Sequence, residues 1–486
     1  MNQINNVDTV VIVGGGTAAW MCAAYLSANT EDIKITLVDK EVGNPVGVGE
    51  ATLLNFERFL NECGFERHKW FNEIDATFKS GILFPNWGAK DNLVWHPFLL
   101  NTAFDKNTTL YDCWSHHQEK YPIANASAFY SVSLANKVDS ENANYYAMHV
   151  DCSKLVLWLQ TQLENKIEII KSEMVEVIRE DSGFIKSLKL KNGTSVSGDL
   201  FVDCTGFKSL LAANPHKVNL RGRLFCDTAV AGHIPYEDVE EERIPFVISE
   251  AVDDGWIWRI PVQSRIGSGL VFNRSITDPE VAKKNLCNYW EGRITPDTLK
   301  VIDWSPYYRN NAWEYNSVAI GLASGFIEPL ESTGISIIQS GIVNLCNFIK
   351  SKYWTRLDQE RHNSYVIAEY NDCVDFVNMH YAKSTIESPF WNWVRETYQP
   401  SELLKFYLDK LESETPFLNE GKGILFSGAN WNCWLTQMGY SAGKKNNIDS
   451  ETAAILLKDW VNFQKKFRLA YSPTHTEAIE RMLSTR

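Results

Sequence analysis

Alternating runs of apolar and polar residues outline the N-terminal part of the chain. Residues 9–13 read Thr-Val-Val-Ile-Val, a continuous β-branched run typical of a strand buried in a parallel sheet. The glycine-rich segment Gly14–Trp20 follows at once, and a helix-forming stretch continues through 23–26. A second strand-like run, Lys34–Val38, ends at Asp39. This order predicts one strand–helix–strand unit.

The pattern changes after residue 166. Short alternating runs extend from Lys166 to Phe201 and are joined at Asn192-Gly193, a dipeptide typical of hairpin turns. We therefore expect an antiparallel meander, which leads into the segment Asp203–Phe207. Such a meander would interrupt the parallel sheet, so the module that contains this sheet is predicted to be discontinuous in sequence.

Later runs predict further buried elements. A third apolar run, Val318–Phe326, leads into the segment Glu328–Gly334. The following stretch, Ile335 to about Ile349, is apolar on most faces and predicts a buried helix. Beyond about residue 350 the pattern is mostly helical and rich in aromatic residues, which predicts a helical cap.

Composition and charge narrow the class of protein. The chain has 486 residues and a net charge of −13, which argues against a nucleic-acid partner or an anionic membrane surface. Its ten cysteines form no C-x-x-C pair, so neither a zinc site nor a disulfide framework is expected. No signal-type or membrane-spanning apolar segment is recognised, and we expect a cytoplasmic enzyme. The seventeen tryptophans favour aromatic core packing, and a few could line a pocket for a flat aromatic substrate.

The glycine-rich segment carries a candidate cofactor site. Gly14-x-Gly16-x-x-Ala19 lies between strand and helix and fits the dinucleotide fingerprint, with Ala in place of the third Gly. Glycines allow the backbone to approach the pyrophosphate, whose charge is stabilised at the helix N-terminus. Asp39 is placed to bind a ribose hydroxyl. The alternative is a plain glycine-rich turn, and the fingerprint does not separate FAD from NAD.

Four further segments, in this order along the chain, identify a family. They are Gly47–Thr52, Phe78–Gly81, Trp256–Pro261 (W-x-W-x-I-P) and Glu328–Gly334. Together they resemble the flavin-dependent tryptophan halogenases and their relatives, from about residue 9 to 350 and more loosely to about 440. The resemblance implies an α/β fold, with a Rossmann-like FAD module of the two-dinucleotide-fold type, β-meander insertions and a mainly helical C-terminal substrate cap.

The implied domains and cofactor contacts follow from this resemblance. Residues 1–350 would form the FAD module, with substrate-pocket insertions at about 82–145 and 210–310, and residues 351–486 the cap. The residues expected to bind FAD are Gly14, Gly16, Thr17, Ala18, Ala19, Asp39, Lys40, Glu50, Ala51, Val175, Leu322 and Ile335.

The family chemistry implies roles for four residues. Reduced FAD, oxygen and a halide ion together yield hypohalous acid, which is delivered to a lysine matched here by Lys79. Glu331 matches the glutamate near the reacting carbon, where it accepts the ring proton or stabilises the cationic intermediate. Thr333 and Gly334, at a helix start, are expected to bind the halide. The structural alternatives are a surface lysine and a carboxylate that stabilises the helix dipole.

The substrate pocket is expected to involve five further residues. Trp256 and Trp258 match a wall near the flavin, although residues at i and i+2 could simply share the buried face of a strand. His96 and Phe98 resemble a pocket-lining segment, although an isolated histidine is often structural. Trp431 is expected to line the pocket as well.

The late part of the chain departs from the tryptophan-specific members. These carry two adjacent tyrosines and a glutamate that clamp the amino-acid backbone. The matching positions here are Trp431-Asn432 and Met438, and Asp449 and Glu451 lie too far along the chain to substitute. A neutral lining cannot pair a buried ammonium. We therefore expect an indole- or phenol-type aromatic substrate rather than free tryptophan.

Two other functions compete with halogenation. A flavin-dependent aromatic monooxygenase shares the fingerprint but needs neither Lys79, Glu331 nor the W-x-W wall. A non-enzymatic flavin-binding scaffold or sensor would have no need of the lysine and glutamate. No second nucleotide fingerprint follows a strand, so a separate NAD(P)H flavin reductase is the expected partner that supplies FADH2. The choice of chloride, bromide or iodide, and whether the protein is a homo-oligomer, stay open.

Overall fold

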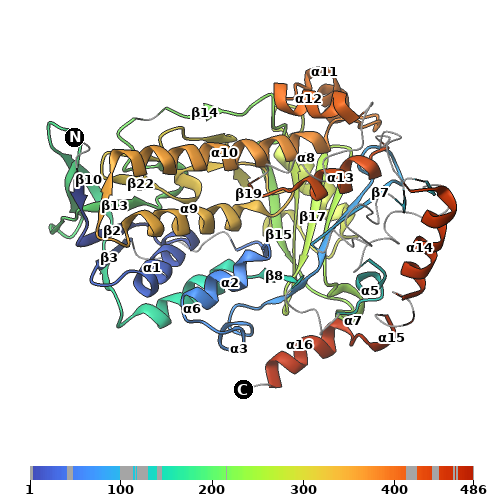
Figure 1. Ribbon diagram of the computed structural model, residues 1–486, viewed down its shortest axis with the longest axis horizontal. Helices are drawn as coiled ribbons and strands as arrows, with labels where there is room; N and C mark the ends of the chain where they lie inside the picture. Colours follow the sequence, from blue (N-terminus) through green and yellow to red (C-terminus); the bar gives the residue numbers. More distant parts are fainter. Residues whose placement is uncertain are drawn as a thin grey trace. The chain divides into compact units, whose positions relative to one another are not determined.

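The computed structural model describes residues 4–40, 47–98, 113–114, 116–117, 130–138, 145–214, 216–411, 424–439, 448–463, 466 and 469–484 (Figure 1). The chain forms two compact units that interleave along the sequence. Unit 1 comprises Met1–Asp75, Val150–Arg221 and Trp304–Asn371, and unit 2 comprises Ala76–His149, Gly222–Asp303 and Asp372–Arg486. The predicted domain boundary between residues 350 and 351 stays a prediction, and α10 (Arg356–His380) contributes residues to both units.

Unit 1 is built on a mixed sheet with the strand order β21-β22-β13-β2-β3-β9. Its main elements are β2 (Thr9–Val13), α1 (Thr17–Asn29), β3 (Lys34–Asp39), α2 (Asn55–Glu62), α3 (Arg67–Trp70), α6 (Cys152–Leu163), β9 (Glu168–Lys171), β10 (Met174–Arg179), β11 (Ile185–Leu190), β12 (Ser195–Val196), β13 (Leu200–Asp203), β21 (Trp313–Glu314), β22 (Ser317–Ala319) and α9 (Thr333–Ile349). Minor elements are β1 (Ile4–Asn6) with β24 (Tyr353–Thr355), β4 (Glu50–Ala51), the 3-10 turns η3 (Gly206–Lys208) and η5 (Gly321–Ala323), and β14 (Val218–Asn219) with β20 (Tyr307–Tyr308) and β23 (Gly325–Phe326).

The strand–helix–strand unit predicted from the sequence is confirmed. β2 pairs in parallel with β3 on one side and with β13 on the other. Four of the five β2 residues are buried, as expected for a central strand covered on both faces. Helices α1 and α9 pack against each other beside this sheet (Figure 1). The glycine-rich turn that follows β2 therefore lies at the carboxyl end of the parallel strands.

The predicted meander and buried helix are also present. β10, β11 and β12 form an antiparallel sheet, and Gly193 adopts a φ of 86° in the turn between β11 and β12. That left-handed conformation explains the Asn-Gly dipeptide there. Helix α9 begins two residues before the predicted Ile335 and ends at Ile349, and most of its residues are buried.

Unit 2 is built on an antiparallel sheet with the strand order β19-β15-β18-β17-β16-β6-β7, in which only β16 and β6 run parallel among the described strands. Its elements are β5 (Thr77–Lys79), β6 (Gly81–Pro85), β7 (Leu93–Pro97), α5 (Tyr130–Leu134), β8 (Ala147–Val150), β15 (Thr228–Ile234), α7 (Val239–Glu242), β16 (Val247–Val252), β17 (Gly255–Pro261), β18 (Ile266–Phe272), α8 (Pro279–Tyr289), the 3-10 turn η4 (Pro296–Thr298), β19 (Lys300–Asp303), α11 (Pro389–Thr397), α12 (Glu402–Leu411), α13 (Gly428–Gln437), α14 (Ser450–Phe463), α15 (Leu469–Tyr471) and α16 (His475–Ser484).

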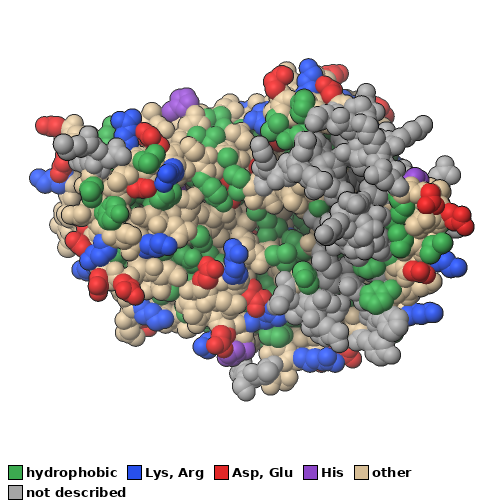
Figure 2. All heavy atoms as spheres, viewed as in Figure 1, with side chains coloured by type: hydrophobic (Ala, Val, Ile, Leu, Met, Phe, Trp, Pro, Cys, Tyr) green, Lys and Arg blue, Asp and Glu red, His purple; other side chains and the backbone are tan. Residues whose placement is uncertain are grey.

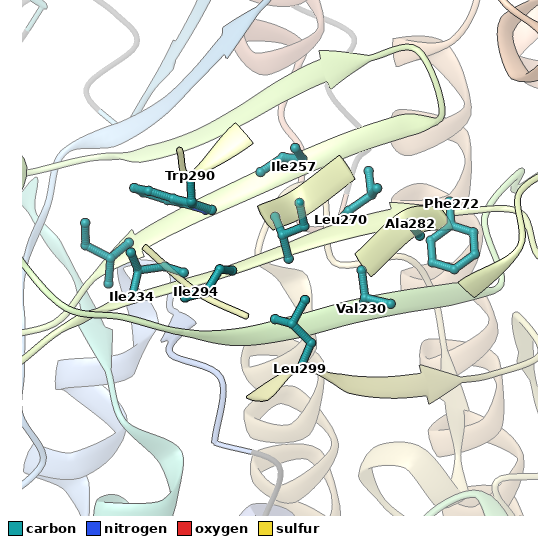
Figure 3. Close-up of a cluster of buried hydrophobic side chains, with 11 residues drawn as sticks. Val230, Ile234, Ile257, Leu270, Phe272, Ala282, Trp290, Ile294 and Leu299 are labelled. Carbon is teal, nitrogen blue, oxygen red and sulfur yellow. The ribbon is translucent and has the colours of Figure 1, made fainter. Parts of the chain in front are cut away.

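One hydrophobic core of unit 2 lies between the sheet and α8. Figure 3 shows Val230, Ile257 and Leu270, on the strands, in one cluster with Ala282 of α8 and with Trp290, which follows the helix. The helix is fixed at its start because the Asp278 carboxylate accepts a hydrogen bond from the backbone of Glu280. Through Ile257 this core also includes β17, the strand that carries the W-x-W-x-I-P string.

Most of the tryptophan-rich clusters pack in cores, as the sequence suggests. Trp87, Trp391 and Trp434 are fully buried, and Trp87 lies edge-to-face against the other two rings at centroid distances of 5.6 and 6.3 Å. Such contacts stabilise a core by about 0.5–1.5 kcal/mol each beyond area burial. These tryptophans are therefore structural, and the pocket hypothesis applies to other aromatic residues.

Surface charge and hydropathy agree with the composition. On the face shown in Figure 2, acidic and basic side chains of the described residues are interspersed and do not gather into one basic patch. Among the described residues, none of the helices is both long and apolar enough to cross a lipid bilayer.

Candidate active site

The turn between β2 and α1 forms a cradle with room for a phosphate group. A Cβ on Gly14 would collide with the Cys204 carbonyl, and Gly14 has a φ of 143°, so only glycine fits there. A Cβ on Gly16 would meet nothing within 4 Å, so the space in front of the helix start is open. No side chain caps α1 at this end. The backbone N–H groups of Thr17 and Ala18 in its first turn are thus placed for a pyrophosphate, whereas that of Ala19 donates to the Gly16 carbonyl, and the cradle fits a dinucleotide.

Gly15 is a residue of this cradle that sequence reasoning missed. A Cβ on Gly15 would collide with the Asp39 carboxylate, so the turn and the end of β3 approach each other closely. Asp39 is buried, and burial is the main cause that raises its pKa, against the opposing charges of Lys171 and Lys40. Lys40 itself is exposed. Asp39, which is predicted to bind a ribose hydroxyl, therefore lies beside the turn, as the dinucleotide fingerprint requires.

The remaining predicted FAD residues lie on several elements of unit 1. The Glu50 carboxylate accepts a hydrogen bond from the backbone of Cys152, and Ala51 is buried. Leu322 lies in η5, where a Cβ on neighbouring Gly321 would come within 2.8 Å of the Ala18 side chain. The structure therefore brings η5 and the start of α1 together. Ile335 is buried in α9, and Val175 on β10 is 57% exposed.

The start of α9 has the features of a small anion site. Glu328 and Glu331 are buried in the segment that leads into the helix, and Ser332 turns the chain with a left-handed φ of 60°. The Thr333 hydroxyl is buried without a hydrogen-bond partner among the described residues. A Cβ on Gly334 would meet nothing within 4 Å. An uncapped helix start with an unused hydroxyl fits a halide ion.

Lys79 is not a surface lysine, because its side chain is fully buried. It ends β5, which pairs antiparallel with β8, and its Nζ lies 5.0 Å from the centre of the Phe98 ring. A cation over an aromatic face is attracted by the ring quadrupole. The structure therefore brings together two residues that the sequence singled out separately.

His96 and Trp431 lie in one aromatic group built around α10. The His96 ring is 5.5 Å from Phe376, and the Trp431 ring is 5.1 Å from Phe376 in an edge-to-face arrangement. Phe426 stacks on Phe376 at 3.9 Å, and Asn430 Nδ2 lies 2.9 Å from His96 Nε2. Phe376, Phe426 and Asn430 were not predicted, because no local pattern links them to residue 96.

Trp256 and Trp258 point to the same face of β17, with ring centres 6.2 Å apart. Both are buried, and neither indole N–H has a hydrogen-bond partner among the described residues. A Cβ on Gly269, on the neighbouring strand, would collide with the Trp258 ring, so this glycine makes room for the indole. The two indoles form one buried apolar surface, and their role as a wall near the flavin stays a prediction.

Comparison with known proteins decides the family. The tryptophan halogenase family model matches residues 9–453. The chain belongs to the tryptophan halogenase family. It is 32% identical over 425 residues to a tryptophan 6-halogenase from Streptomyces albogriseolus, covering 81% of this chain and 80% of the relative. It is 30% identical over 423 residues to a tryptophan 7-halogenase from Lentzea aerocolonigenes, covering 80% of this chain and 79% of the relative.

Solved structures confirm the fold and the enzyme class. A flavin-dependent halogenase from Xanthomonas campestris matches with a TM-score of 0.91 and 28% identity, over 98% of each chain. Another from Brevundimonas matches with a TM-score of 0.88 and 28% identity, over 98% of this chain and 99% of the other. The predicted α/β flavoprotein fold is thus confirmed, and the chain is a flavin-dependent halogenase.

The clamp positions of this halogenase carry no charged side chain. Trp431 is buried in the aromatic group, and buried Met438 packs against Gly88, where an added Cβ would lie 2.8 Å from its terminal methyl group. Asp449 is exposed and caps α14, accepting hydrogen bonds from the backbone and hydroxyl of Thr452. The side chain of Asn432 lies outside the described residues. Asp449 is therefore engaged at a helix start rather than in the aromatic group.

Proposed function

We propose that this halogenase transfers an oxidised halogen to an electron-rich, indole- or phenol-type substrate through Lys79. The observation that carries the proposal is the complete burial of Lys79 beside Phe98. Lysines are almost never fully buried unless their charge is paired, so this burial sets Lys79 apart from an ordinary lysine. When bound, reduced FAD supplies hypohalous acid from oxygen and a halide ion. A buried ammonium donates a hydrogen bond to the halogen species more strongly than a hydrated one, which makes the halogen more electrophilic.

The residues of unit 1 supply the other parts of the proposed reaction. The halide would bind at Thr333 and Gly334. In the transfer step the oxygen–halogen bond breaks and a carbon–halogen bond forms at the ring. The ring proton passes to the Glu331 carboxylate, and the oxygen leaves as water after taking up a proton. Glu331 is buried, so its carboxylate is an electrostatic partner for the cationic ring intermediate.

The proposal includes a partner enzyme. The described fingerprint at Gly14–Ala19 is accounted for by FAD, and the sequence offers no second one after a strand. We therefore propose that a separate NAD(P)H flavin reductase supplies FADH2 by diffusion.

The test combines the protein with a generic flavin reductase. Indoles, phenols and anilines are screened against chloride, bromide and iodide, and products are identified by mass spectrometry. Lys79→Ala should abolish the halogenated product while reduced flavin is still oxidised by oxygen, because the lysine acts after hypohalous acid forms. Lys79→Met keeps the apolar stem and should behave in the same way. A wild-type product that gains oxygen instead of halogen would identify a monooxygenase and contradict the proposal.

A further inference from the structure

The hydroxyl of Thr77, two residues before Lys79, fixes the proton position on a buried histidine. Thr77 Oγ1 lies 2.6 Å from the carbonyl oxygen of Pro261 and 2.8 Å from Nδ1 of His149. A carbonyl oxygen can only accept, so the single hydroxyl proton is used on Pro261. The contact to the imidazole is therefore a bond in which Nδ1–H donates to Thr77. His149 carries its proton on Nδ1.

The other ring nitrogen of His149 is consequently a bare lone pair. His149 is fully buried, and burial first, with the charge of Lys79 second, lowers its pKa well below the ordinary value. The ring is neutral, and a neutral imidazole has one N–H. Nε2 is buried with no hydrogen-bond partner among the described residues. An unused buried acceptor of this kind is costly unless it serves a ligand or a moving group.

The strand register places this lone pair on the lysine's face of the sheet. Thr77 is directly opposite His149, and Lys79 is opposite Ala147. Side chains two apart on a strand share a face, so Lys79 and His149 are diagonal neighbours. Ala147, opposite Lys79, contributes only a methyl group to this face. The positive charge of Lys79 is, after burial, a cause that lowers the pKa of His149, as expected for neighbouring groups.

We propose that His149 is a positioning residue for Lys79, whose ammonium donates a hydrogen bond to the His149 Nε2 lone pair during halogen transfer. The inference rests on the proposed role of Lys79. The ammonium has three donors on a flexible stem, so it can bind this acceptor and still donate to the halogen species. A neutral acceptor fixes the ammonium without cancelling the positive charge that polarises the halogen. A carboxylate at this position would cancel it.

The hydrogen bonds also link the lysine to the family signature string. Pro261 ends W-x-W-x-I-P, and its carbonyl orients the Thr77 hydroxyl. Thr77 sets the tautomer of His149, and His149 presents its lone pair to Lys79. In this series of hydrogen bonds Lys79 donates to His149, His149 to Thr77, and Thr77 to Pro261. All four residues belong to unit 2.

Two substitutions separate this role from a purely structural one. The amide of His149→Asn can replace Nδ1–H as the donor to Thr77, but it does not reach the Nε2 position. The longer His149→Gln can place its amide oxygen there and give up the Thr77 bond. Losing a hydrogen bond to a charged group should lower the halogenation kcat roughly 10- to 100-fold in His149→Asn, with the KM for the aromatic substrate little changed. We expect His149→Gln to stay within about 3-fold of wild type, since it keeps the acceptor.

A purely structural histidine would give the opposite order, with His149→Asn the more active variant, and that result would overturn the proposal. The second measured quantity is the halogenated product formed per reduced flavin oxidised. It should fall in His149→Asn with the rate, because hypohalous acid still forms and is lost. An unchanged ratio would also contradict the role assigned to His149.

A spectroscopic measurement on the histidine tests the same inference without turnover. In protein labelled with nitrogen-15 histidine, the signal that disappears in His149→Asn should show a protonated Nδ1 and an unprotonated Nε2, and the Nε2 shift should move in Lys79→Met. A proton on Nε2, or no response to Lys79→Met, would refute the inference. Should wild type yield no halogenated product while both signatures are present, the proposed function fails and the coupling of His149 to Lys79 stands.

Discussion

Replacing His475 by glutamine should make the protein less sensitive to acid. His475 begins α16 and is fully buried. Its Nδ1 lies 2.6 Å from the Arg243 carbonyl oxygen, and its Nε2 lies 3.2 Å from the backbone nitrogen of Phe78. The carbonyl must accept and the amide must donate, so the ring is the neutral Nδ1–H form. The bond from Phe78 to His475 thereby connects β5 to the start of α16.

The magnitude follows from the difference in proton affinity between the folded and unfolded states. Burial lowers the pKa of His475 to about 3, against an ordinary value of about 6.5 in the unfolded chain. Between these values only the unfolded state binds the proton, so stability is complete above pH 6.5 and falls as the pH decreases toward 3. The loss approaches about 1.4 kcal/mol per pH unit and amounts to about 2 kcal/mol at pH 5.

In the variant, the pH-dependent loss of stability at this position is replaced by a loss that is the same at every pH. In His475→Gln the amide oxygen can accept from Phe78, but the bond to Arg243 is lost, which costs about 1–3 kcal/mol at pH 8. At pH 5 wild type has lost a similar amount, so the two stabilities should converge there. Urea unfolding followed by tryptophan fluorescence at pH 8, 7, 6 and 5 measures both curves.

The other buried titratable groups are common to both proteins. The difference between the unfolding free energies of variant and wild type therefore reports on His475 alone. His216→Gln replaces an exposed ring and is the matched control, whose curve should run parallel to wild type. If the His475→Gln curve also runs parallel to wild type from pH 8 to 5, the neutral buried ring assigned to His475 is refuted.

Further predictions address the cofactor, the base, the reductase and the substrate. Gly15→Ala should weaken FAD binding by about 10-fold or more in fluorescence titration, because its Cβ displaces the Asp39 carboxylate, whereas Gly341→Ala meets only ordinary contacts and should not. Glu331→Gln should slow product formation in single turnovers with little effect on flavin affinity. NADH without a reductase should not reduce bound FAD in stopped-flow absorbance, and rapid reduction would contradict the proposed partner. Indole should show a higher kcat/KM than free tryptophan under one halide and one reductase.

Local patterns were sufficient to predict the framework of unit 1. The strand Thr9–Val13, the glycine turn and Asp39 are adjacent in sequence or joined by one helix, so their periodicity and spacing carry the structure. The meander turn at Asn192-Gly193 was predictable because a left-handed φ selects glycine locally. Lys79 and Glu331 were singled out through motifs, and both are buried, while their catalytic roles stay predictions.

The supports of Lys79 could not be predicted in the same way. His149 meets Thr77 across 72 residues, and His475 meets Phe78 across 397 residues. Neither histidine lies in a motif, and a lone histidine on a strand or at a helix start carries no local signal. Both were recognised only because the structure shows which atom of each ring must donate. Sequence reasoning therefore singled out Lys79 and missed the two buried histidines that contact its neighbours Thr77 and Phe78.

The charge distribution in unit 2 gives the physical reason for the expected preference for uncharged substrates. Two carboxylates, half-buried Asp372 and buried Asp375, lie on α10 within about one turn of Phe376, and desolvation raises the pKa of both. Asp372 accepts the backbone N–H groups of Leu425 and Phe426, and Asp375 pairs with Arg223 at 2.6 Å.

A tryptophan ammonium would have to exchange its hydration shell for a carboxylate that already binds other groups, as Asp375 binds Arg223, and burial without full pairing costs several kcal/mol. Indole requires no such exchange and gains about 1 kcal/mol for each aromatic contact it makes. A clear kcat/KM preference for free tryptophan would show that one of these carboxylates, or a side chain outside the described residues, serves as the clamp. Asp372→Asn and Asp375→Asn would then identify it, because only the clamp residue would lose tryptophan turnover while indole turnover is retained.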